Sequence, residues 1–557
     1  MGDPVTASTA PERTAKASGG VLITLASAQF LMTLDSSVMN VSIATVAKDV
    51  GTTVTGIQTA ITLYTLVMAS LMITGGKIGQ IWGRKRAFAI GCVIYGCGSL
   101  LTALSQNLAT LLIGWSLLEG IGAALIMPAV VALVASNFGR ADRPRAYGLV
   151  ASAGAIAVAA GPLIGGLFTT YASWRWVFVG EVLVVLIILA LARRMDDTPA
   201  DKGARLDIVG TVLSALGLAL VVFGVLRSGT WGLITPKPNA PELLGLSPVI
   251  WLIFLGGCVL AGFLAWERRR LDRGQAVLLD PAMLDNKLLR GGLVSFFFQY
   301  LLQAGLFFAV PLFLSVALGL SAIATGVQLL PLSITLLLAA AGVPKVFPNA
   351  SPRRVVRIGF LSLFASLVIL IALLDLGAGP EIITWPMLLA GLGIGALASQ
   401  LGAITVSAVP DEQSGEVGGL QNTVTNLGAS IGTALAGAVL ISALTGSFIA
   451  GIQDNPGIPQ EVKSNAQVEL GNGIPFISDT DLRKALEDAG VPAAEADAIV
   501  EENEQSRLAG LRASLAVLAL FALLAFIFAN GIPTRQPGAA PPTDDAESAV
   551  NSSHPVT

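Results

Sequence analysis

Three carboxylates lie inside long apolar segments of this sequence: Asp35, Glu119 and Glu181. An ionised carboxylate at the centre of a membrane helix costs about 2.5–3.5 kcal/mol on insertion scales, so such a group normally faces a wet cavity. None of the three has an obvious basic partner in another apolar segment, so each should stay neutral until water reaches it. We therefore predict proton coupling at these positions. The alternative is a silent structural acid, such as Asp35 hydrogen-bonded to Asn40 or to a neighbouring span.

Other chemistry has little support in the sequence. The single histidine, His554, lies in a polar tail, and the three cysteines Cys92, Cys97 and Cys258 lie in apolar segments without a CxxC pair. This pattern disfavours zinc sites, disulfide frameworks and redox motifs. The chain contains no G-x-x-x-x-G-K-[ST] phosphate-binding loop and no visible cluster of catalytic side chains. We expect no cofactor, no metal site and no enzyme activity.

The elements that would hold the three acids are membrane helices. Hydrophobic residues make up 54% of the 557 residues and charged residues only 12%, against about 25% charged in an ordinary soluble domain. A helix needs about 20 apolar residues to cross the hydrocarbon of a bilayer. The predicted fold class is therefore all-α integral membrane, with about fourteen transmembrane helices. They are expected at 20–42, 55–76, 86–105, 108–135, 145–170, 174–194, 206–228, 247–267, 289–317, 322–343, 354–376, 383–408, 416–446 and 509–531.

Basic residues recur at alternate connections, which predicts the orientation. Short loops rich in Lys and Arg stay in the cytoplasm, and an even number of spans then places both termini there. No signal peptide is evident before the first span, so we expect a multi-pass protein of the inner (plasma) membrane. The net charge of −3 offers no basic field for nucleic acid. The basic clusters are Lys77 with Arg84, Lys85 and Arg86; Arg140, Arg143 and Arg145; Arg193, Arg194, Lys202 and Arg205; Arg268, Arg269, Arg270 and Arg273; and Arg353, Arg354 and Arg357.

The acidic segment 451–507 falls on the outer side by the same alternation. Ser478 followed by Asp481 resembles a helix N-cap, Gly490 can end that helix, and Pro492 can begin another. We predict a small helical hairpin. It is either a solvated connection between the last two spans or a surface that gates the substrate path or binds an extracytoplasmic partner.

A glycine-rich basic turn follows the second span, with the sequence GGKIGQIWGRKR from Gly75 to Arg86. Its glycines allow a sharp turn and close helix packing. The turn resembles the signature loop of the major facilitator superfamily, G-x-L-a-D-r-x-G-R-K-R. The matching positions are Gly76, Gly79, Gln80, Gly83, Arg84, Lys85 and Arg86.

Two further segments resemble the drug:proton antiporters of that superfamily. The fifth span contains Gly161, Pro162, Gly165 and Gly166 in the order of the GPxxGG antiporter motif, whose proline and glycines let a helix bend and pack closely. The first span contains LDSSVMNV from Leu34 to Val41. It is similar to the L-D-x-T-I-V-N-V-A pattern of the fourteen-span branch, which implies a proton-coupling role for Asp35.

The resemblance implies a major facilitator fold, in which two six-helix bundles enclose a site at the membrane midplane that opens to one side at a time. The LDIVG segment from Leu206 to Gly210 is similar to the opening of the two extra central helices of the fourteen-span branch. The expected organisation is a cytoplasmic tail at 1–19, an N-terminal bundle at 20–194, two extra central helices at 206–267, a C-terminal bundle at 289–531 that includes the hairpin 451–507, and a disordered cytoplasmic tail at 532–557.

The sequence departs from the family pattern at charged positions. Gln80 replaces the aspartate of the signature loop, so the charge pairing that holds the outward-facing state in relatives must be weaker or replaced. The fourth span has Ser116 in place of the usual arginine and gains Glu119, and Thr425 replaces the arginine of the thirteenth span. These changes indicate a divergent subgroup and leave the substrate range open.

These features predict a secondary active transporter that couples proton entry to the efflux of amphipathic or cationic small molecules, as in multidrug export. A dedicated metabolite, peptide or lipid transporter and a transport-silent membrane sensor that binds a partner through the hairpin are the alternatives. The expected partners are a small-molecule substrate, protons and membrane lipids. The polar candidates for the cavity are Asn40, Gln299, Gln303, Gln328, Gln400, Gln421 and Asn422. The possible aromatic walls are Phe296, Phe297 and Phe298. Because adjacent residues point in different directions around a helix, one or two of these rings at most can face a cavity.

Overall fold

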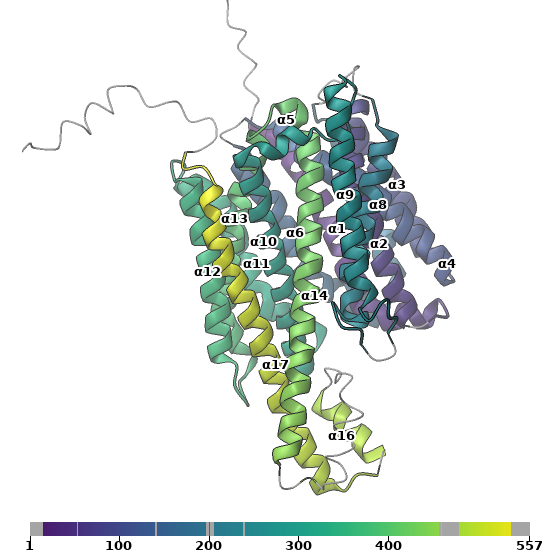
Figure 1. Cartoon of the computed structure of the whole chain (residues 1–557), viewed down its shortest axis with the longest axis vertical. Coiled ribbons are helices and arrows are strands. Elements are labelled where there is room, and N and C mark those ends of the chain that lie inside the picture. Colours follow the sequence, from purple (N-terminus) through teal and green to yellow (C-terminus); the bar gives the residue numbers. More distant parts are fainter. Residues whose placement is uncertain are drawn as a thin grey trace, which may run out of the picture.

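The computed structural model describes residues 15–52, 54–139, 142–196, 200, 205–237, 240–455, 458, 478–488 and 490–535. Within these ranges all the long elements are helices, and they stand side by side as one bundle (Figure 1). Thirteen of them are long and apolar enough to cross a membrane. The helix α6, Arg143–Tyr171, has 29 residues and occupies the predicted fifth span. The predicted all-α membrane fold is confirmed.

In the first group of helices, one span changes from α-helix to π-helix and back. In the fourth span, the short helix α4 continues into the π-helix η1 and then into α5 without a break. Gly83 separates α2 from α3 with φ +93°, a left-handed conformation that favours glycine. The helices are α1 (Ala15–Asp49), α2 (Val54–Trp82), α3 (Arg84–Ala103), α4 (Leu108–Leu111), η1 (Leu112–Glu119), α5 (Gly120–Asn137), α6 (Arg143–Tyr171) and α7 (Arg175–Ala192).

Two helices, α8 (Ile208–Trp231) and α9 (Pro248–Asp272), follow and pack against each other. Asp207 caps α8, since its Oδ1 accepts a hydrogen bond of 3.0 Å from the Val209 amide. Its second oxygen lies 3.2 Å from Nε of Arg270, which ties the start of α8 to the end of α9. The helix α8 also packs against both α2 and α14.

The remaining helices form a second group. They are η2 (Pro281–Asp285), α10 (Lys287–Leu312), η3 (Phe313–Ala317), α11 (Ala322–Val346), α12 (Pro352–Leu373), η4 (Pro380–Ile383), α13 (Thr384–Ser407), η5 (Asp411–Gln413), α14 (Ser414–Asp454), α16 (Asp479–Asp488), α17 (Ala493–Phe528) and η7 (Ala529–Gly531).

Two helices of the second group are much longer than a bilayer requires. At 1.5 Å per residue, the 41 residues of α14 span about 60 Å, against about 30 Å of hydrocarbon. The end of α14, the start of α17 and α16 pack together beyond the other helices as a small lobe (Figure 1). The buried residues of the lobe are Leu444, Phe448, Ile452, Ile458 and Ile499.

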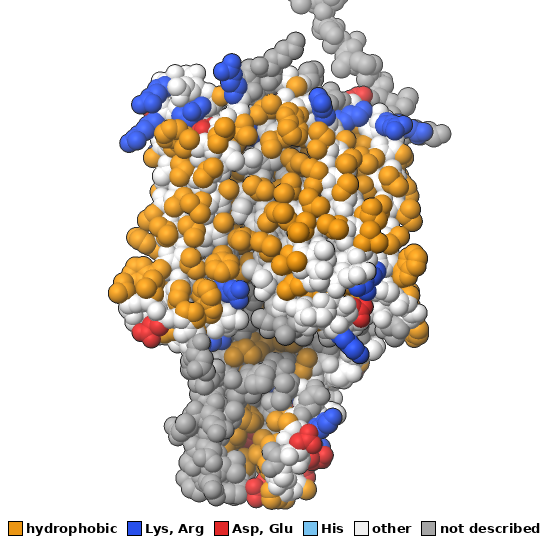
Figure 2. Space-filling view, turned by 90° about the vertical axis from the view of Figure 1, so that its right-hand side faces the viewer, with side chains coloured by type: hydrophobic (Ala, Val, Ile, Leu, Met, Phe, Trp, Pro, Cys, Tyr) orange, Lys and Arg blue, Asp and Glu red, His pale blue; other side chains and the backbone are white. Residues whose placement is uncertain are grey.

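The lobe defines one end of the molecule, and we call the opposite end the basic end. On the face seen in Figure 2, hydrophobic side chains form a broad band, and Lys and Arg are most numerous beyond it at the basic end. The start of α12 and the end of α17 lie together, because Arg353 Nε donates a hydrogen bond of 2.7 Å to the carbonyl of Ile532, just after α17.

The structure refines the predicted boundaries in two places. Residues 15–19, expected in the N-terminal tail, already belong to α1. The second helix of the expected hairpin is not separate, because α17 runs unbroken from Ala493 into the last span. Most of 456–477, and the tail regions 1–14 and 536–557, lie outside the described residues.

Candidate functional site

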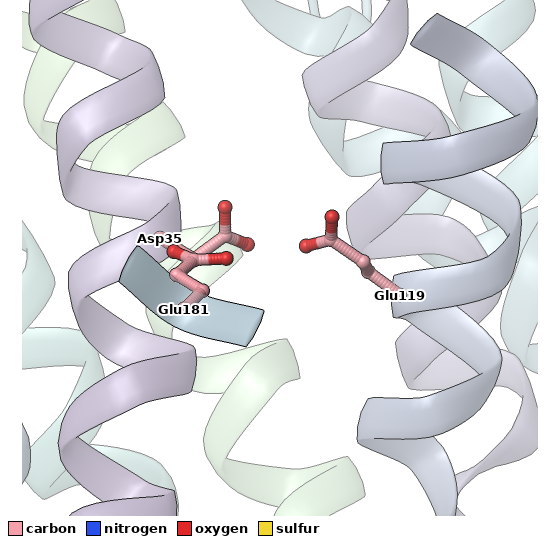
Figure 3. A group of neighbouring side chains, drawn as sticks. All are labelled: Asp35, Glu119 and Glu181. Atoms are coloured by element: carbon pink, nitrogen blue, oxygen red, sulfur yellow. The ribbon is translucent and has the colours of Figure 1, made fainter. Parts of the chain in front are cut away.

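The three predicted acids meet in one buried space. Asp35 comes from α1, Glu119 from η1 and Glu181 from α7, and one carboxylate oxygen from each lies within 4.8 Å of the others. Figure 3 shows the three carboxyl groups turned toward a shared space. Their exposed fractions are 0%, 0% and 2%. We call this group the carboxylate triad.

Each carboxylate of the triad has one oxygen that accepts a hydrogen bond and one oxygen without a partner among the described residues. The donors come from three different side-chain types on the surrounding helices. Trp115 Nε1 donates to Asp35 Oδ1 at 2.7 Å, Thr102 Oγ1 donates to Glu119 Oε1 at 3.1 Å, and Ser99 Oγ donates to Glu181 Oε2 at 3.0 Å. The triad is therefore held in place, with three oxygens left to bind a proton or another cation.

The π-helix η1 supplies two of these side chains. Trp115 and Glu119 both lie on η1 and are both buried, and the Trp115 ring stacks on Tyr64 of α2 at a centroid distance of 5.1 Å. A π-helical turn changes the angular spacing of side chains and is frequent at functional sites. Here η1 places the Trp115 indole where it donates to Asp35, and it also places the Glu119 carboxylate beside Asp35.

The charges within the triad constrain its chemistry. No ion pair between the triad and a Lys or Arg occurs in the described part of the chain. Buried carboxylates this close together cannot all be ionised, because like charges and desolvation both oppose it. Carboxylate oxygens could also ligate a hard cation. The arrangement can therefore take up and release positive charge, and protons are the smallest carriers.

A second feature is a small cavity of about 80 Å³ between the two groups of helices. Four of the predicted cavity residues line it: Phe296, Gln299, Gln421 and Asn422. The other lining residues are Gln29, Met127, Val130, Val131, Tyr147, Val150, Ala151, Tyr300, Ala398, Gly402 and Thr425. We call it the central cavity, and its lining shows that both groups of helices contribute to one site.

The remaining cavity candidates lie elsewhere in this closed conformation. Gln303 and Gln328 are partly exposed, and buried Gln400 donates to Ser399 Oγ at 3.4 Å. Phe298 packs against Phe521 and Phe528. Phe297 also lies outside the lining, where its carbonyl abuts Gly428, and the side chain of Asn40 is not described.

Sequence reasoning missed several residues of the central cavity. Gln29 lies on α1 within an otherwise apolar stretch, so a polar side chain in the first span was an available signal. Tyr147 and Tyr300 gave no such signal, because the apolar ring and polar hydroxyl of a tyrosine suit a membrane interface as well as a helix core. Their position depends on how the two groups of helices meet.

The signature loop closes the basic end with a different charge pair from that of the family pattern. Lys77 of α2 forms a buried ion pair of 2.9 Å with Glu416 of α14. Gln80, which replaces the expected aspartate, is partly exposed, and its Oε1 has no partner among the described residues. The charge pairing that Gln80 cannot make is thus accompanied by the ion pair of Lys77 with Glu416, and Lys77 lies about one turn before Gln80 on α2.

Two arginines add to this closure. Arg84 donates to the backbone carbonyls of Asp411 and Glu412, and Arg143 pairs with the Asp411 carboxylate at 3.1 Å. Lys85 instead caps the end of α7, donating to the carbonyl of Arg193 at 2.9 Å. Arg86 is exposed. The first group of helices is therefore joined to the second at the basic end.

Glycine contacts show how close this approach is. A Cβ on Gly76 would lie 2.4 Å from the Gly415 carbonyl oxygen, and one on Gly402 would lie 2.6 Å from the Tyr147 ring. No side chain fits at either position without moving a helix. The passage through the basic end is closed in this structure.

The antiporter-like motif lies on α6, where this helix packs against α1. A Cβ on Gly161 would lie 2.0 Å from Ser37 Oγ, and one on Gly165 would lie 3.2 Å from the Val38 Cα. Gly166 is partly exposed, and the side chain of Pro162 is not described. The motif therefore brings α6 against the part of α1 that carries Asp35.

A larger groove of about 940 Å³ lies between α8 and α14, toward the lobe end. Most of its lining is aliphatic, including Val221, Leu427 and Ile431, and none of the triad or of the cavity amides lines it. Because a specific ligand site needs convergent polar groups as well as apolar walls, we take the central cavity as the candidate substrate site.

The sequence model of the Major Facilitator Superfamily matches residues 25–433. The chain is 30% identical over 439 residues to a puromycin resistance protein of Streptomyces alboniger, covering 77% of this chain and 83% of that protein. It is 28% identical over 440 residues to a probable actinorhodin transporter of Streptomyces coelicolor, covering 77% and 73%.

Among solved structures, the chain is similar in fold to a human organic anion transporter. The TM-score is 0.53 at 14% sequence identity, and the match covers 92% of this chain and 97% of that one. At this identity the likeness concerns the fold alone.

Proposed function

The chain belongs to the major facilitator superfamily, and from that membership we propose that it is a proton-coupled exporter of small amphipathic molecules. The names of its relatives, for puromycin resistance and probable actinorhodin transport, support export of antibiotic-like compounds. The observation that carries the proposal is the carboxylate triad, a buried site with three unpartnered carboxylate oxygens that can take up and release positive charge. We further propose that the basic end faces the cytoplasm.

In the proposed cycle the structure is the state with the cytoplasmic end closed. Protons enter from the lobe side and neutralise the triad. Rocking of the two helix groups then opens the basic end, where the protons leave and substrate enters the central cavity. One proton moving down 100 mV supplies about 2.3 kcal/mol, enough for accumulation of a few tens-fold since 1.4 kcal/mol is tenfold.

The test is Asp35→Asn in cells that express the chain. Accumulation of a panel of amphipathic antibiotics is measured with and without a protonophore, together with the amount and melting temperature of the purified protein. We expect Asp35→Asn to accumulate the compounds as strongly as cells without the transporter, because the asparagine cannot exchange a proton.

Glu267→Gln provides a matched control. Glu267 is a fully buried acid of α9 that accepts a hydrogen bond of 2.9 Å from the Leu278 amide, outside the triad. We expect it to retain proton-dependent export. Export by Asp35→Asn at the normal rate, still abolished by the protonophore, would refute the assignment of the proton site.

A further inference from the structure

We propose that the central cavity selects uncharged aromatic molecules that carry hydrogen-bonding groups, in preference to cations. This inference rests on the proposed export function and names the substrate class of the same site. It is drawn from the side chains of the cavity and from the position of the nearest charged groups.

The lining combines amides with aromatic rings. Gln29, Gln299, Gln421 and Asn422 supply carboxamides, while Tyr147, Tyr300 and Phe296 supply rings. Among the fifteen described residues of the lining there is no Lys, Arg, Asp or Glu. Amides donate and accept hydrogen bonds without carrying charge, so they match the N–H and C=O groups of a neutral heteroaromatic or quinone-like ligand.

One of these amides is incompletely bonded. The Gln299 side chain is 2% exposed, and its Oε1 has no hydrogen-bond partner within the described parts of the chain. A buried acceptor without a donor is costly and uncommon in a folded protein. A ligand that brings an N–H or O–H into the cavity would satisfy it.

A cation would find no counter-charge at this site. The three acids of the triad do not belong to the described lining of the cavity. Glu416 is already neutralised by Lys77 in a buried pair. Contact with Tyr147, Tyr300 or Phe296 attracts a cation only weakly compared with the water it must lose. The cavity therefore disfavours permanent positive charge.

The central cavity, at about 80 Å³, is smaller than a drug-sized site, which needs about 300 Å³ or more. Substrate must enter when the two helix groups separate, and the same polar residues then line a wider space. If the substrate carries no charge, each exchanged proton moves one net charge inward. The membrane potential then drives export together with the pH gradient.

Two fluorescent probes of nearly equal shape separate the alternatives. Acridone is an uncharged tricyclic ring with one N–H and one C=O, whereas 10-methylacridinium is a permanent cation of similar size. Their dissociation constants are measured on the full-length protein in lipid nanodiscs. We expect acridone to bind at least tenfold more tightly than 10-methylacridinium.

Variants at Gln299 test the chemistry directly. Gln299→Leu removes the amide and should weaken acridone binding about tenfold without improving binding of the cation. Gln299→Glu places a carboxylate in the cavity and should reverse the preference toward 10-methylacridinium. Gln275→Glu, an exposed residue outside the cavity, makes the same change in net charge and should leave both affinities unchanged.

Two results would overturn the proposal: equal or tighter binding of 10-methylacridinium by the unaltered protein, or no binding of acridone. Failure of the export function is distinguishable, since it would leave acridone bound to the protein but not exported by energised cells. Asp35→Asn should likewise keep acridone binding while losing export, because Asp35 does not line the cavity.

Discussion

Asp35, Glu119 and Glu181 have similar burial but different hydrogen-bond donors, an indole, a threonine and a serine respectively. Carboxyl groups this close together titrate in successive macroscopic steps, and the apparent pKa values belong to the triad rather than to any one residue. In the proposed mechanism, the number of protons exchanged per cycle is therefore a property of the triad. No single carboxylate need carry the coupling alone.

Glu119→Gln is expected to lower the number of protons exchanged for each transported molecule, because it removes one titrating group and leaves the Thr102 hydrogen-bond position occupied. The ratio is measured in proteoliposomes from the membrane potential at which net substrate flux stops. An unchanged ratio would show that Glu119 keeps its proton throughout the cycle and serves only as a structural acid.

The pair Lys77–Glu416 should stabilise the conformation with the basic end closed. Both side chains are buried, with exposed fractions of 7% and 5%. Removing one partner of a buried pair leaves an uncompensated charge and typically costs about 3–5 kcal/mol, whereas replacing both with apolar residues can be neutral. Lys77→Met should therefore lower the melting temperature, and Lys77→Met combined with Glu416→Leu should restore most of it. Additive losses in the double variant would contradict this interpretation.

The sequence predicted which residues belong to the site better than it predicted which residues they contact. Asp35, Glu119 and Glu181 could be found one by one, because an acid in an apolar segment is conspicuous. Their convergence depends on how three helices are rotated about their axes, and the sequence pattern of each helix alone does not determine this. Lys77 and Glu416 lie 339 positions apart, so neither position indicated the other.

At the scale of whole helices, two glycines determine how closely α6 packs against α1. Along α6, Gly161 and Gly165 lie against Ser37 and Val38 of α1 with no room for a side chain. This contact fixes the distance between the helix that carries Asp35 and the helix that packs against α11 and α13 of the second group. Its loss should affect transport as well as stability.

Gly161→Ala should lower both the melting temperature and the export rate, since its Cβ would lie 2.0 Å from Ser37 Oγ. Gly180→Ala on α7 is the control, because nothing lies within 4 Å of the added Cβ. Combining Gly161→Ala with Ser37→Gly should recover part of the loss. Normal export by Gly161→Ala alone would show that the contact between α1 and α6 is not required.

At this scale the sequence predicted where helices cross the membrane better than where they end. The apolar run expected at 416–446 lies within α14, which extends to Asp454. The run expected at 509–531 covers the end of α17 and η7, and α17 extends back to Ala493. An apolar run marks contact with lipid, whereas a helix can continue through polar residues into water. The π-helix η1 was also not predictable, since its residues have ordinary helical composition.

Across the whole molecule, the proposed orientation can be tested with two cysteines in a variant without Cys92, Cys97 and Cys258. Asp375 is exposed after α12 at the lobe end, and Arg86 is exposed at the basic end. A membrane-impermeant maleimide added to intact cells should label Asp375→Cys but not Arg86→Cys. Permeabilised cells should label both. Labelling of Arg86→Cys alone in intact cells would invert the proposed topology and, with it, the direction of transport.

The helix α14 runs unbroken from the basic end to the lobe, so a rotation of the helix at one end would displace the other end. One stretch of this helix meets α2 at the basic end, and its far end forms part of the lobe. A rocking rotation on the order of 10°, acting on an arm that projects about 30 Å past the bilayer, displaces the lobe by roughly 5 Å. In the proposed cycle, the position of the lobe outside the membrane therefore follows which end of the transporter is open.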